Sequence, residues 1–458
     1  SPTVRRQRGQ SVVWRGQRMS DRRRQTASHD NAEYLLCSQI RIDNFDRIQL
    51  GRPAVLSPRF RRFADGKRVA AIGVGLVKAG DPPAAIRIAV VVDSFFGYGG
   101  AEMLARQWAI RTSALGHEVS VFCADAALSA LDRGKMWAGV FSVKPSRLSK
   151  INRTFGELRK LAKISASLIR RGPFDIIHSH RLLPVADVIT LGFPLCWIEE
   201  GMPGKKKTPI HPLYKRLEKE TVRVAKCLIA TSPLALELWV EHYPEYETKF
   251  ELIRPGVDTR AIESTDRDEA RASLARRFGM DPSLPLLLFV GNDWKRKRLP
   301  ECLEAISLLS FPANLIVAGH GGKDASMRRR ENDRIRFVGT IAAGIERFYA
   351  GADCLLFPSR LENFGMVVTE SLSVGTPVIT SSRTGAKEAV EETGMGRILQ
   401  EPIVPRDIAI AIAKMFPEGK APGQCSRPSP LDRKYDWETS LDRLLSVYAR
   451  VFASRKAG

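Results

Sequence analysis

Two glutamates on either side of a glycine are the residues of this sequence best suited to chemistry. Glu362 and Glu370 lie eight positions apart in the segment Glu-Asn-Phe-Gly-Met-Val-Val-Thr-Glu, which follows an apolar run ending at Phe357. A carboxylate accepts several hydrogen bonds, so Glu370 can hold the diol of a ribose and Glu362 the hydroxyls of a sugar. Gly365 lets the backbone approach a ligand closely, and the free amides at the start of the next helix attract an anion. Taken alone, this spacing fits a solvated helix face better, so the case for a sugar and anion site depends on the residues that surround the segment.

Alternating strands and helices provide the frame that positions this site. Ile86–Val92 is a short β-branched run, typical of a buried parallel strand, and a predicted helix follows it. The predicted strands are 86–92, 119–123, 174–178, 226–231 and 250–253 in a first series, and 286–290, 314–318, 336–338, 354–357 and 377–380 in a second. The predicted helices are 101–115, 300–309, 366–374 and 437–452. Two such series predict an α/β protein with two Rossmann-like, doubly wound domains that face a central cleft.

The sequence divides into four expected segments. Residues 1–84 hold 17 basic and 7 acidic side chains without sustained apolar periodicity, so we expect a basic, poorly ordered extension. Residues 85–257 and 258–434 are the two predicted Rossmann-like domains. Residues 435–458 contain an amphipathic helix that we expect to return to the N-terminal domain.

The surroundings of the two glutamates resemble glycosyltransferase family 4. Gly375-Thr-Pro-Val-Ile follows the helix at once, and Gly385-Ala-Lys-Glu marks the next strand-to-helix loop, as around the E-x7-E motif of that family. The resemblance covers residues 86–452. It implies the GT-B fold and a retaining glycosyltransferase, with the acceptor on the N-terminal domain and the nucleotide-sugar donor on the C-terminal domain. It also implies that Glu370 binds the nucleotide ribose and Glu362 the donor sugar.

Two segments of the N-terminal domain resemble the same family. Gly99-Gly100 matches its glycine-rich loop, which approaches the donor diphosphate and sugar. Asp175-Ile-Ile-His-Ser-His180 matches a D-x-x-H-x-H segment in which the counterpart of His180 contacts the donor sugar. We expect His180 to face the cleft and His178 to point to the opposite face of its strand.

A basic run after the first strand of the second series completes the resemblance. Val290-Gly-Asn-Asp-Trp-Lys-Arg-Lys297 occupies the loop in which an arginine and a lysine of the family hold the diphosphate. Arg296 and Lys297 match best, although Lys295 and Arg298 allow other registers. A solvated basic loop is the alternative, and the position after a core strand favours a ligand. Such cations would stabilise the charge that develops on a departing diphosphate.

These matches define the predicted site. The residues expected to act in catalysis are Glu362, His180, Arg296 and Lys297. The residues expected to bind the donor are Gly99, Gly100, Gly291, Arg296, Lys297, Asn363, Phe364, Gly365, Met366, Val367 and Glu370. The resemblance implies that the leaving phosphate itself takes the acceptor proton. No Asp-x-Asp motif is placed to hold a metal, so we expect no metal and no essential cofactor beside the nucleotide-sugar donor, with a UDP-sugar favoured.

Within the family, the sequence looks closest to lipopolysaccharide core glucosyltransferases. This predicts transfer of a hexose from UDP-glucose or a similar donor to a glycan or glycolipid, in the synthesis of lipopolysaccharide or another cell-surface polysaccharide. Another GT-B enzyme, such as a nucleotide-sugar epimerase, is one alternative, although it gives no reason for the Gly99-Gly100 loop and the glutamate pair together. A basic nucleic-acid-binding protein is the other, but no recognition module accompanies the charge, so no nucleic acid is expected as a partner.

Charge and composition suggest where the protein works. The formal net charge of +22 favours an anionic partner, such as a nucleotide, an anionic membrane or a phosphorylated glycan, although a general basic bias explains it equally well. No apolar run reaches the roughly 18 residues that span a bilayer, and no signal peptide is visible. Seven cysteines scattered singly suit a reducing compartment. We therefore expect a cytoplasmic enzyme. The apolar side of a predicted basic helix over 155–171 fits an ordinary domain helix packed on the sheet better than a membrane-bound one. Its charges and the loop Lys205–Lys207 are expected to attract the protein peripherally to the inner membrane.

Overall fold

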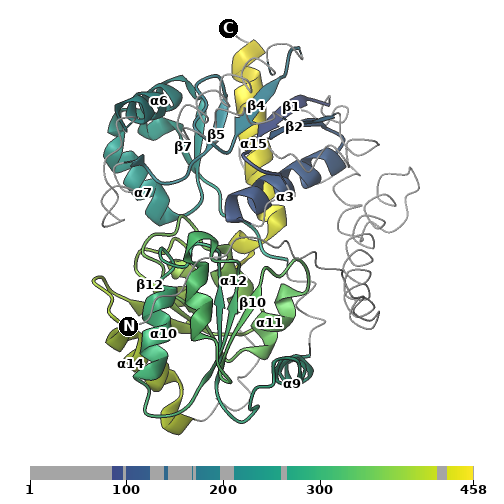
Figure 1. The fold of residues 1–458 in the computed structure, drawn as a ribbon. Helices are drawn as coiled ribbons and strands as arrows, with labels where there is room; N and C mark the ends of the chain where they lie inside the picture. The colour runs from purple at the N-terminus through teal and green to yellow at the C-terminus, as the bar shows by residue number, and fades with distance from the viewer. Residues whose placement is uncertain are drawn as a thin grey trace, which may run out of the picture. The chain divides into compact units, whose positions relative to one another are not determined.

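The computed structural model describes residues 85–95, 99–123, 139–142, 168, 172–195, 211–258, 266–419 and 431–456. Within these residues the strands form two sheets with helices packed on them (Figure 1). The expected basic extension 1–84 and the loop Lys205–Lys207 lie outside the described residues. The predicted basic helix over 155–171 also lies outside them, apart from Leu168.

The first sheet has seven parallel strands in the order β3-β2-β1-β4-β5-β6-β7. Alternate residues of its first strand serve opposite faces: Ile88 and Val90 belong to one buried cluster, and Ala89 and Val91 to another. Burial on both faces explains why this strand reads as a continuous apolar run. The strands are β1 (Arg87–Val91), β2 (Glu118–Cys123), β3 (Gly139–Ser142), β4 (Ile176–Ser179), β5 (Val188–Thr190), β6 (Cys227–Ala230) and β7 (Phe250–Leu252).

Helices α3 (Gly100–Ala114), α6 (His211–Val224) and α7 (Pro233–His242) belong to this first half, and the 3-10 helix η3 (Pro244–Lys249) follows α7. The start of α7 is set locally. Oγ of Ser232 accepts a hydrogen bond from the amide of Ala235 at 3.1 Å, and Pro233 at the first helical position has no amide to leave unpaired.

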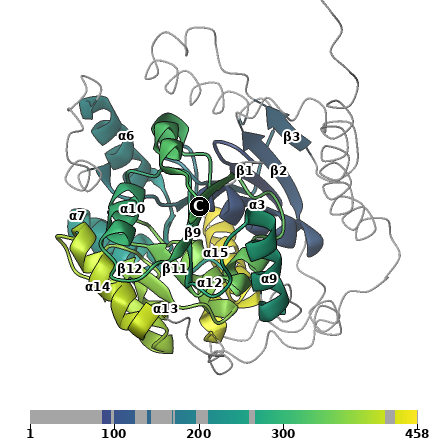
Figure 2. The same cartoon turned by 60° about the horizontal axis from the view of Figure 1, so that its bottom comes forward.

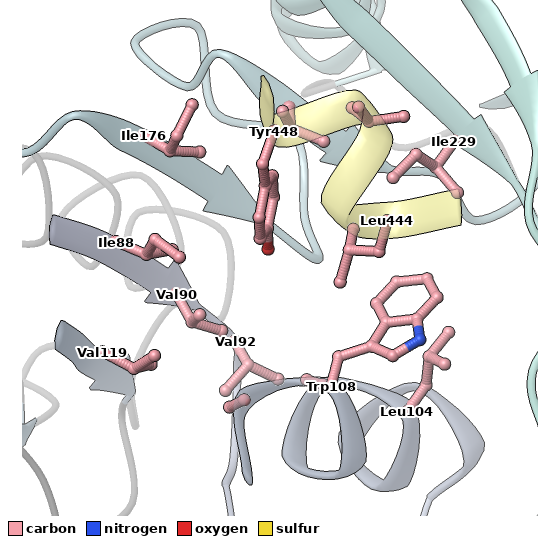
Figure 3. Packing of buried hydrophobic residues seen from close by; sticks show 14 of the residues in the cluster. Ile88, Val90, Val92, Leu104, Trp108, Val119, Ile176, Ile229, Leu444 and Tyr448 are labelled. Carbon is pink, nitrogen blue, oxygen red and sulfur yellow. The ribbon is translucent and has the colours of Figure 1, made fainter. Parts of the chain in front are cut away.

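The last helix, α15 (Trp437–Lys456), packs on the first sheet although it follows the second in sequence. Leu444 and Tyr448 of α15 lie in one cluster with Trp108 of α3 (Figure 3), and Nε1 of Trp108 donates to Oγ of Ser440 at 2.9 Å. The short η6 (Arg433–Tyr435) leads into α15. Neither α15 nor any other helix in the described part of the chain is long and apolar enough to cross a membrane.

The second sheet has six parallel strands in the order β10-β9-β8-β11-β12-β13. They are β8 (Leu286–Val290), β9 (Asn314–Ala318), β10 (Ile335–Gly339), β11 (Cys354–Phe357), β12 (Val378–Ser381) and β13 (Gly396–Leu399). Its helices are α9 (Arg267–Phe278), α10 (Leu299–Ser307), α11 (Ile345–Gly351), α12 (Met366–Ser373), α13 (Lys387–Thr393) and α14 (Pro405–Met415), with the 3-10 helices η4 (Gly322–Arg330) and η5 (Pro417–Gly419). α10 packs against α14 and α9 against α11. Figure 2 shows α10 and α14 together on the left and α9 on the right.

Both sheets share one topology. Across each sheet the strands lie in the order third, second, first, fourth, fifth, sixth, where the numbers count along the chain. The strand order therefore reverses between β1 and β4 in the first sheet and between β8 and β11 in the second. Parallel sheets of this kind bind ligands outside the carboxyl ends of the strands at this reversal point. The predicted α/β fold with two Rossmann-like, doubly wound sheets is confirmed, and the topology marks two places where functional residues should gather.

Three strands were not predicted from the sequence. β5 has only three residues, β3 begins with a glycine, and β13 begins with Gly396 followed by the charged Arg397. Such short or polar segments lack the apolar run that identified the other strands. The predicted strands are present, and the ends of several lie one or two residues from the prediction.

Candidate active site

The loops that follow β8 and β11 carry three of the four charged residues that the sequence singled out in this half. Nη1 of Arg296 lies 2.9 Å from Oε2 of Glu362, and Nζ of Lys297 lies 3.5 Å from the same oxygen. Arg296 also donates to the backbone oxygen of Leu361 at 2.6 Å. The topology thus brings together one carboxylate and two cations at the reversal point of the second sheet.

Gly291 makes room for Lys297. A Cβ on Gly291 would overlap the side-chain carbons of Lys297, and the φ of +152° at Gly291 suits only glycine. A Cβ on Gly319 would in turn overlap the backbone oxygen of Gly291. The Lys297 side chain therefore lies flat on the strand end, with Nζ 4.4 Å from the ring centroid of Phe357. Gly291 acts by shaping this loop.

The structure distinguishes the four cations of the run. The side chain of Lys295 is 73 % exposed and pairs with Asp324. Arg298 is buried and pairs with Glu401. Only Arg296 and Lys297 reach Glu362 among the described contacts of this run.

Burial and charge compete at this triad. Burial alone would raise the pKa of Glu362, but Lys297 and Arg296 more than offset it and hold that pKa below its ordinary value. Burial lowers the pKa of Lys297, and Glu362 opposes this effect. Glu362 is therefore ionised at neutral pH. An entering anion would compete with it for the two cations and free its oxygens for other donors.

Glu370, the second glutamate, lies on α12 and meets a tyrosine. The hydroxyl of Tyr349 donates to Oε2 of Glu370 at 2.7 Å. Burial raises the pKa of Glu370, and the Tyr349 hydrogen bond opposes that rise. Tyr349 is almost fully buried and its own pKa is raised well above the ordinary value by burial. The carboxylate of Glu370 is thus held by one fixed donor.

The residues between the glutamates have different surroundings. Gly365 has φ of +91°, and a Cβ there would lie 3.2 Å from atoms of Glu362 and Phe357. Phe364 is buried in the core of the second sheet. Met366 packs against clusters of both sheets, and Val367 is half-buried. The first amides of α12 have no intrahelical acceptors, so an anion could bind there through the backbone.

Asn363 was predicted to bind the donor, but its side-chain amide is engaged elsewhere. Nδ2 donates to the backbone oxygen of Leu191 at 2.9 Å and to Oγ1 of Thr231 at 2.8 Å. Oγ of Ser232 donates to the backbone oxygen of Asn363 at 2.6 Å. Leu191 and Thr231 follow β5 and β6, so Asn363 joins the Glu362 loop to strand ends of the first sheet.

The orientation of His178 differs from expectation. His178 and His180 lie on the same side, with ring centroids 4.7 Å apart, because residues two apart in an extended strand share a face. The expectation that His178 points to the opposite face was wrong. His178 bonds Oη of Tyr448 at 2.7 Å and Oγ1 of Thr190 at 2.8 Å, which ties β4 to α15.

His180 directly follows β4 and is half-buried. It lies beside Trp108 and His178, and both ring nitrogens are shielded from solvent without a hydrogen-bond partner among the described residues. Burial lowers the pKa of His180 to about 3, so the ring is neutral.

Gly99 and Gly100 lie at the start of α3, after the reversal point of the first sheet. A Cβ on Gly99 would overlap the carboxylate of Glu102, which folds back over it, whereas a Cβ on Gly100 would meet nothing within 4 Å. Close approach of Glu102 thus requires glycine at position 99. Like charges repel, so an anion approaching Gly99 would displace the Glu102 side chain.

Three side-chain contacts around the site were not predicted from the sequence. They are the hydrogen bond of Tyr349 with Glu370 and the ion pairs of Arg298 with Glu401 and of Arg254 with Glu388. Each joins residues far apart in sequence, and none belongs to a local motif. Arg298 stood in the basic run, but its partner follows the last strand of the sheet. The strand order decides these pairs, so no local spacing could have found them.

Two family models match the chain. Residues 98–261 match the model described as Glycosyltransferase Family 4, and residues 284–417 match the model described as Glycosyl transferases group 1. The second range contains the glutamates, Arg296 and Lys297, and the first contains the glycine-rich loop and both histidines. The two matches together span more than half of the sequence.

Curated relatives carry a glycosyltransferase name. The D-inositol 3-phosphate glycosyltransferase of Mycolicibacterium smegmatis is 24% identical over 392 residues, which are 78% of this chain and 88% of the relative. The protein of the same name from Nocardiopsis dassonvillei is 29% identical over 315 residues, covering 62% of this chain and 72% of the relative.

Solved structures share the fold. Sucrose-phosphate synthase from Thermosynechococcus elongatus has a TM-score of 0.66 at 21% identity, covering 80% of this chain and 99% of that chain. WaaG, a glycosyltransferase involved in lipopolysaccharide biosynthesis, has a TM-score of 0.59 at 21% identity over 71% of this chain and 90% of that chain. HepE of Anabaena, solved with UDP-glucose, has a TM-score of 0.61 at 17% identity over 80% of this chain and 100% of that chain. With the two family matches, these findings identify the chain as a glycosyltransferase of the GT-B fold, with a family 4 domain followed by a group 1 domain.

Proposed function

We propose that this glycosyltransferase moves a hexose from UDP-glucose or a similar UDP-sugar to a glycan or glycolipid acceptor, with retention of configuration. The observation that carries the proposal is the contact of Glu362 with Arg296 and Lys297 at the reversal point of the second sheet. A carboxylate for sugar hydroxyls beside two cations for a diphosphate is the arrangement that a nucleotide sugar needs. HepE, solved with UDP-glucose, supports a uridine nucleotide as donor.

Each group has a role in this proposal. Glu370 accepts hydrogen bonds from the ribose, and Glu362 from the donor sugar. Arg296 and Lys297 stabilise the diphosphate, which gains negative charge as its bond to the anomeric carbon breaks. The acceptor oxygen forms its new bond on the same face of the sugar, and its proton passes to the departing phosphate oxygen. No metal and no cofactor beside the donor take part in this scheme.

In this scheme the domain of each sheet binds a different substrate. Residues 258–434 hold the donor, and residues 85–257 hold the acceptor, with His180 and the Gly99-Gly100 loop on the acceptor side. The extension 1–84 contributes no catalytic residue. Deletion of 1–84 should leave transfer activity intact, and a truncated protein that is soluble but inactive would contradict this division.

Two acceptor classes are candidates. The likeness in fold to WaaG supports a lipopolysaccharide or other cell-surface glycan. The name shared by the first curated relatives supports a phosphorylated polyol such as D-inositol 3-phosphate. A panel of lipopolysaccharide core fragments, glycolipids and D-inositol 3-phosphate, each offered with the preferred donor, would separate the two classes by the product formed.

The donor is tested with purified protein and a panel of UDP-, GDP- and ADP-sugars, with release of the nucleotide as the readout. We expect UDP-glucose to react fastest. Glu370→Ala should weaken UDP binding by about 1–3 kcal/mol, because ribose hydroxyls lose their acceptor. Faster release from a GDP- or ADP-sugar would contradict the proposed base, and unchanged UDP affinity in folded Glu370→Ala would contradict the role of this glutamate.

We also propose that the enzyme works in the cytoplasm, in peripheral contact with an anionic membrane. The net charge of +22 supports this, because basic residues near an anionic surface contribute roughly 1 kcal/mol each and are screened by salt. Liposome flotation at low and high salt tests it. Equal recovery with anionic and neutral vesicles at low salt would leave no role for the membrane.

A further inference from the structure

Arg298 occupies a backbone position where glycine is the usual residue. The amide of Leu299 donates to the backbone oxygen of Trp294 at 2.8 Å, and the amide of Arg298 donates to that of Lys295 at 3.2 Å. This pair of hydrogen bonds forms a Schellman motif. In that motif the residue just after the helical turn, here Arg298, takes the left-handed backbone conformation. Arg298 has φ of +59° and ψ of +37°, and it is the only non-glycine residue with positive φ among the described residues.

A left-handed backbone is unfavourable for arginine, whereas glycine would form the same turn without strain. The turn itself therefore gives no reason for an arginine. Strained residues persist where the surrounding structure holds them, and they concentrate at functional sites. The reason for Arg298 must lie in its side chain.

The guanidinium of Arg298 joins three strand ends. It donates from Nη1 to Oε1 of Glu401 at 2.9 Å and from Nη2 to Oε2 at 2.6 Å, and Nη1 also donates to the backbone oxygen of Pro358 at 2.9 Å. Arg298 lies in the loop after β8, Pro358 follows β11, and Glu401 follows β13. The Arg298 side chain is only 4% exposed, and that of Glu401 20%. A two-pronged ion pair of this kind fixes orientation as well as distance.

The same loop is held from its other side. The backbone oxygen of Arg296 accepts from the amide of Arg360 at 2.8 Å and from Oγ of Ser359 at 3.4 Å. Arg296 and Lys297 are thus enclosed between contacts to the β11 loop and the Arg298 ion pair. Rotation of the turn at Arg298 would move both cations relative to Glu362.

We propose that Arg298 and Glu401 form a positioning pair, which holds Arg296 and Lys297 in register to bind the diphosphate of the donor. The inference rests on the proposed role of Arg296 and Lys297 as the diphosphate clamp. Arg298 itself has its two Nη atoms engaged by Glu401 and Pro358, so it acts through its neighbours in the loop. A purely structural role would affect all nucleotides alike, whereas a positioning role acts on the second phosphate.

The test measures the preference for a nucleoside diphosphate over the matching monophosphate. Calorimetry with UDP and UMP, GDP and GMP, and ADP and AMP identifies the pair that binds, and the ratio of the two dissociation constants reports the contribution of the second phosphate. The variants are Arg298→Gly, which keeps the turn without strain, and Glu401→Gln, which keeps the shape of the partner. Arg271→Ala is the matched control, because it breaks a buried ion pair with Asp353 at the opposite ends of the same strands.

We expect Arg298→Gly and Glu401→Gln to lower the diphosphate preference by about tenfold, because small misplacements of binding groups have effects of this size. Arg271→Ala should leave it unchanged. In a Lys297→Ala background, Arg298→Gly should cause little further loss, since the two residues act as a unit. If Arg298→Gly does not fold, the diphosphate preference of Glu401→Gln alone tests the positioning pair.

Two failures are distinguishable. A wild-type preference in folded Arg298→Gly or Glu401→Gln, with a reduced preference in Lys297→Ala, would overturn the positioning pair alone. A wild-type preference in Arg296→Ala and Lys297→Ala would overturn the clamp, and the positioning pair with it. A loss of monophosphate and diphosphate affinity in equal proportion would show that Arg298 supports the fold only.

Discussion

The hydroxyl of Tyr349 donates to Oε2 of Glu370 at 2.7 Å, and this contact fixes how the second glutamate is presented. Tyr349 belongs to α11 and Glu370 to α12, so the contact joins two neighbouring helices of the second sheet. A further hydrogen bond, from Oγ1 of Thr376 to the backbone oxygen of Tyr349 at 2.7 Å, holds the tyrosine in turn. Oε2 of Glu370 is therefore engaged, and Oε1 has no hydrogen-bond partner among the residues that the structure describes.

Tyr349→Phe should weaken nucleotide binding without changing the shape of the core. Loss of the hydroxyl removes the larger of the two effects that oppose burial, so the pKa of Glu370 should rise further. The ionised form that accepts ribose hydroxyls would then appear only at higher pH. We expect UDP affinity to fall by about 1–2 kcal/mol near pH 6 and to recover as pH rises. Calorimetry from pH 5.5 to 8.5 measures this.

The control for this change is Tyr246→Phe, whose ring contacts Lys249 on η3. It should leave both the affinity and its pH dependence unaltered. Equal UDP affinity of Tyr349→Phe and wild type at every pH would mean that Tyr349 does not orient the Glu370 carboxylate.

Arg296→Ala and Lys297→Ala should each lower turnover by about 100-fold, because groups that stabilise developing charge at an active site have effects of this order. Both side chains contact Oε2 of Glu362, at 2.9 Å and 3.5 Å. Lys295→Ala is the matched control, since its side chain is 73% exposed and pairs with Asp324. Initial rates with the preferred nucleotide sugar measure the effect, and wild-type rates in both variants would rule out the clamp.

Arg254 and Glu388 form a second long-range contact, with Nε to Oε1 at 2.6 Å and Nη2 to Oε2 at 2.9 Å. Arg254 follows β7 of the first sheet, and Glu388 lies on α13 of the second. Their side chains are 13% and 17% exposed, so solvent screens the pair only in part. We expect a coupling energy of about 1–3 kcal/mol in a double-mutant cycle with Arg254→Ala and Glu388→Gln, measured by urea unfolding.

The exposed pair Arg223 and Glu220 on α6 serves as the comparison for this cycle. Neighbouring charges in solvent contribute little, so its cycle should show no resolvable coupling. If the cycle for Arg254 and Glu388 also shows no coupling energy, this contact does not stabilise the two sheets against unfolding.

The fold could be predicted because its strands are buried on both faces. β1, β8 and β11 read as apolar runs of the right length, and their residues divide between two cores in the structure. β13 could not be predicted, because Gly396 and Arg397 interrupt its apolar character. Local pattern therefore identifies strands that contain a continuous apolar run and misses those that are very short or interrupted by glycine and charge.

The candidate site could be predicted only where its residues form local motifs. Glu362 and Glu370 lie within one loop and helix, so their spacing is visible in the sequence. Tyr349 lies 21 residues before Glu370, and Arg254 lies 134 residues before Glu388. These partners meet because of strand order and helix packing, which no local spacing encodes. Asn363 belongs to the same local motif, yet the contacts of its side-chain amide with Leu191 and Thr231 could not be read from that motif.

The two ring nitrogens of His180 are shielded from solvent and unpartnered among the described residues, and this arrangement has a consequence for stability. Burial lowers its pKa from 6.5 in the unfolded chain to about 3 in the folded chain. Below pH 6.5 the unfolded state therefore binds more protons than the folded state, and stability falls as pH falls toward 3. His178 acts in the same direction, because burial and the neighbouring His180 lower its pKa too.

His180→Phe should remove its share of this acid sensitivity. Phenylalanine keeps a flat ring beside Trp108 and has no nitrogen to leave unpaired, so the core should tolerate it. Between pH 7.5 and pH 5 we expect wild type to lose up to about 2 kcal/mol more stability than the variant. Urea unfolding at the two pH values measures this, and Thr112→Val serves as the control, because it removes a buried hydroxyl that does not titrate. An equal loss of stability in His180→Phe and wild type would mean that His180 is protonated in the folded protein, and so that its ring nitrogens reach water or a partner.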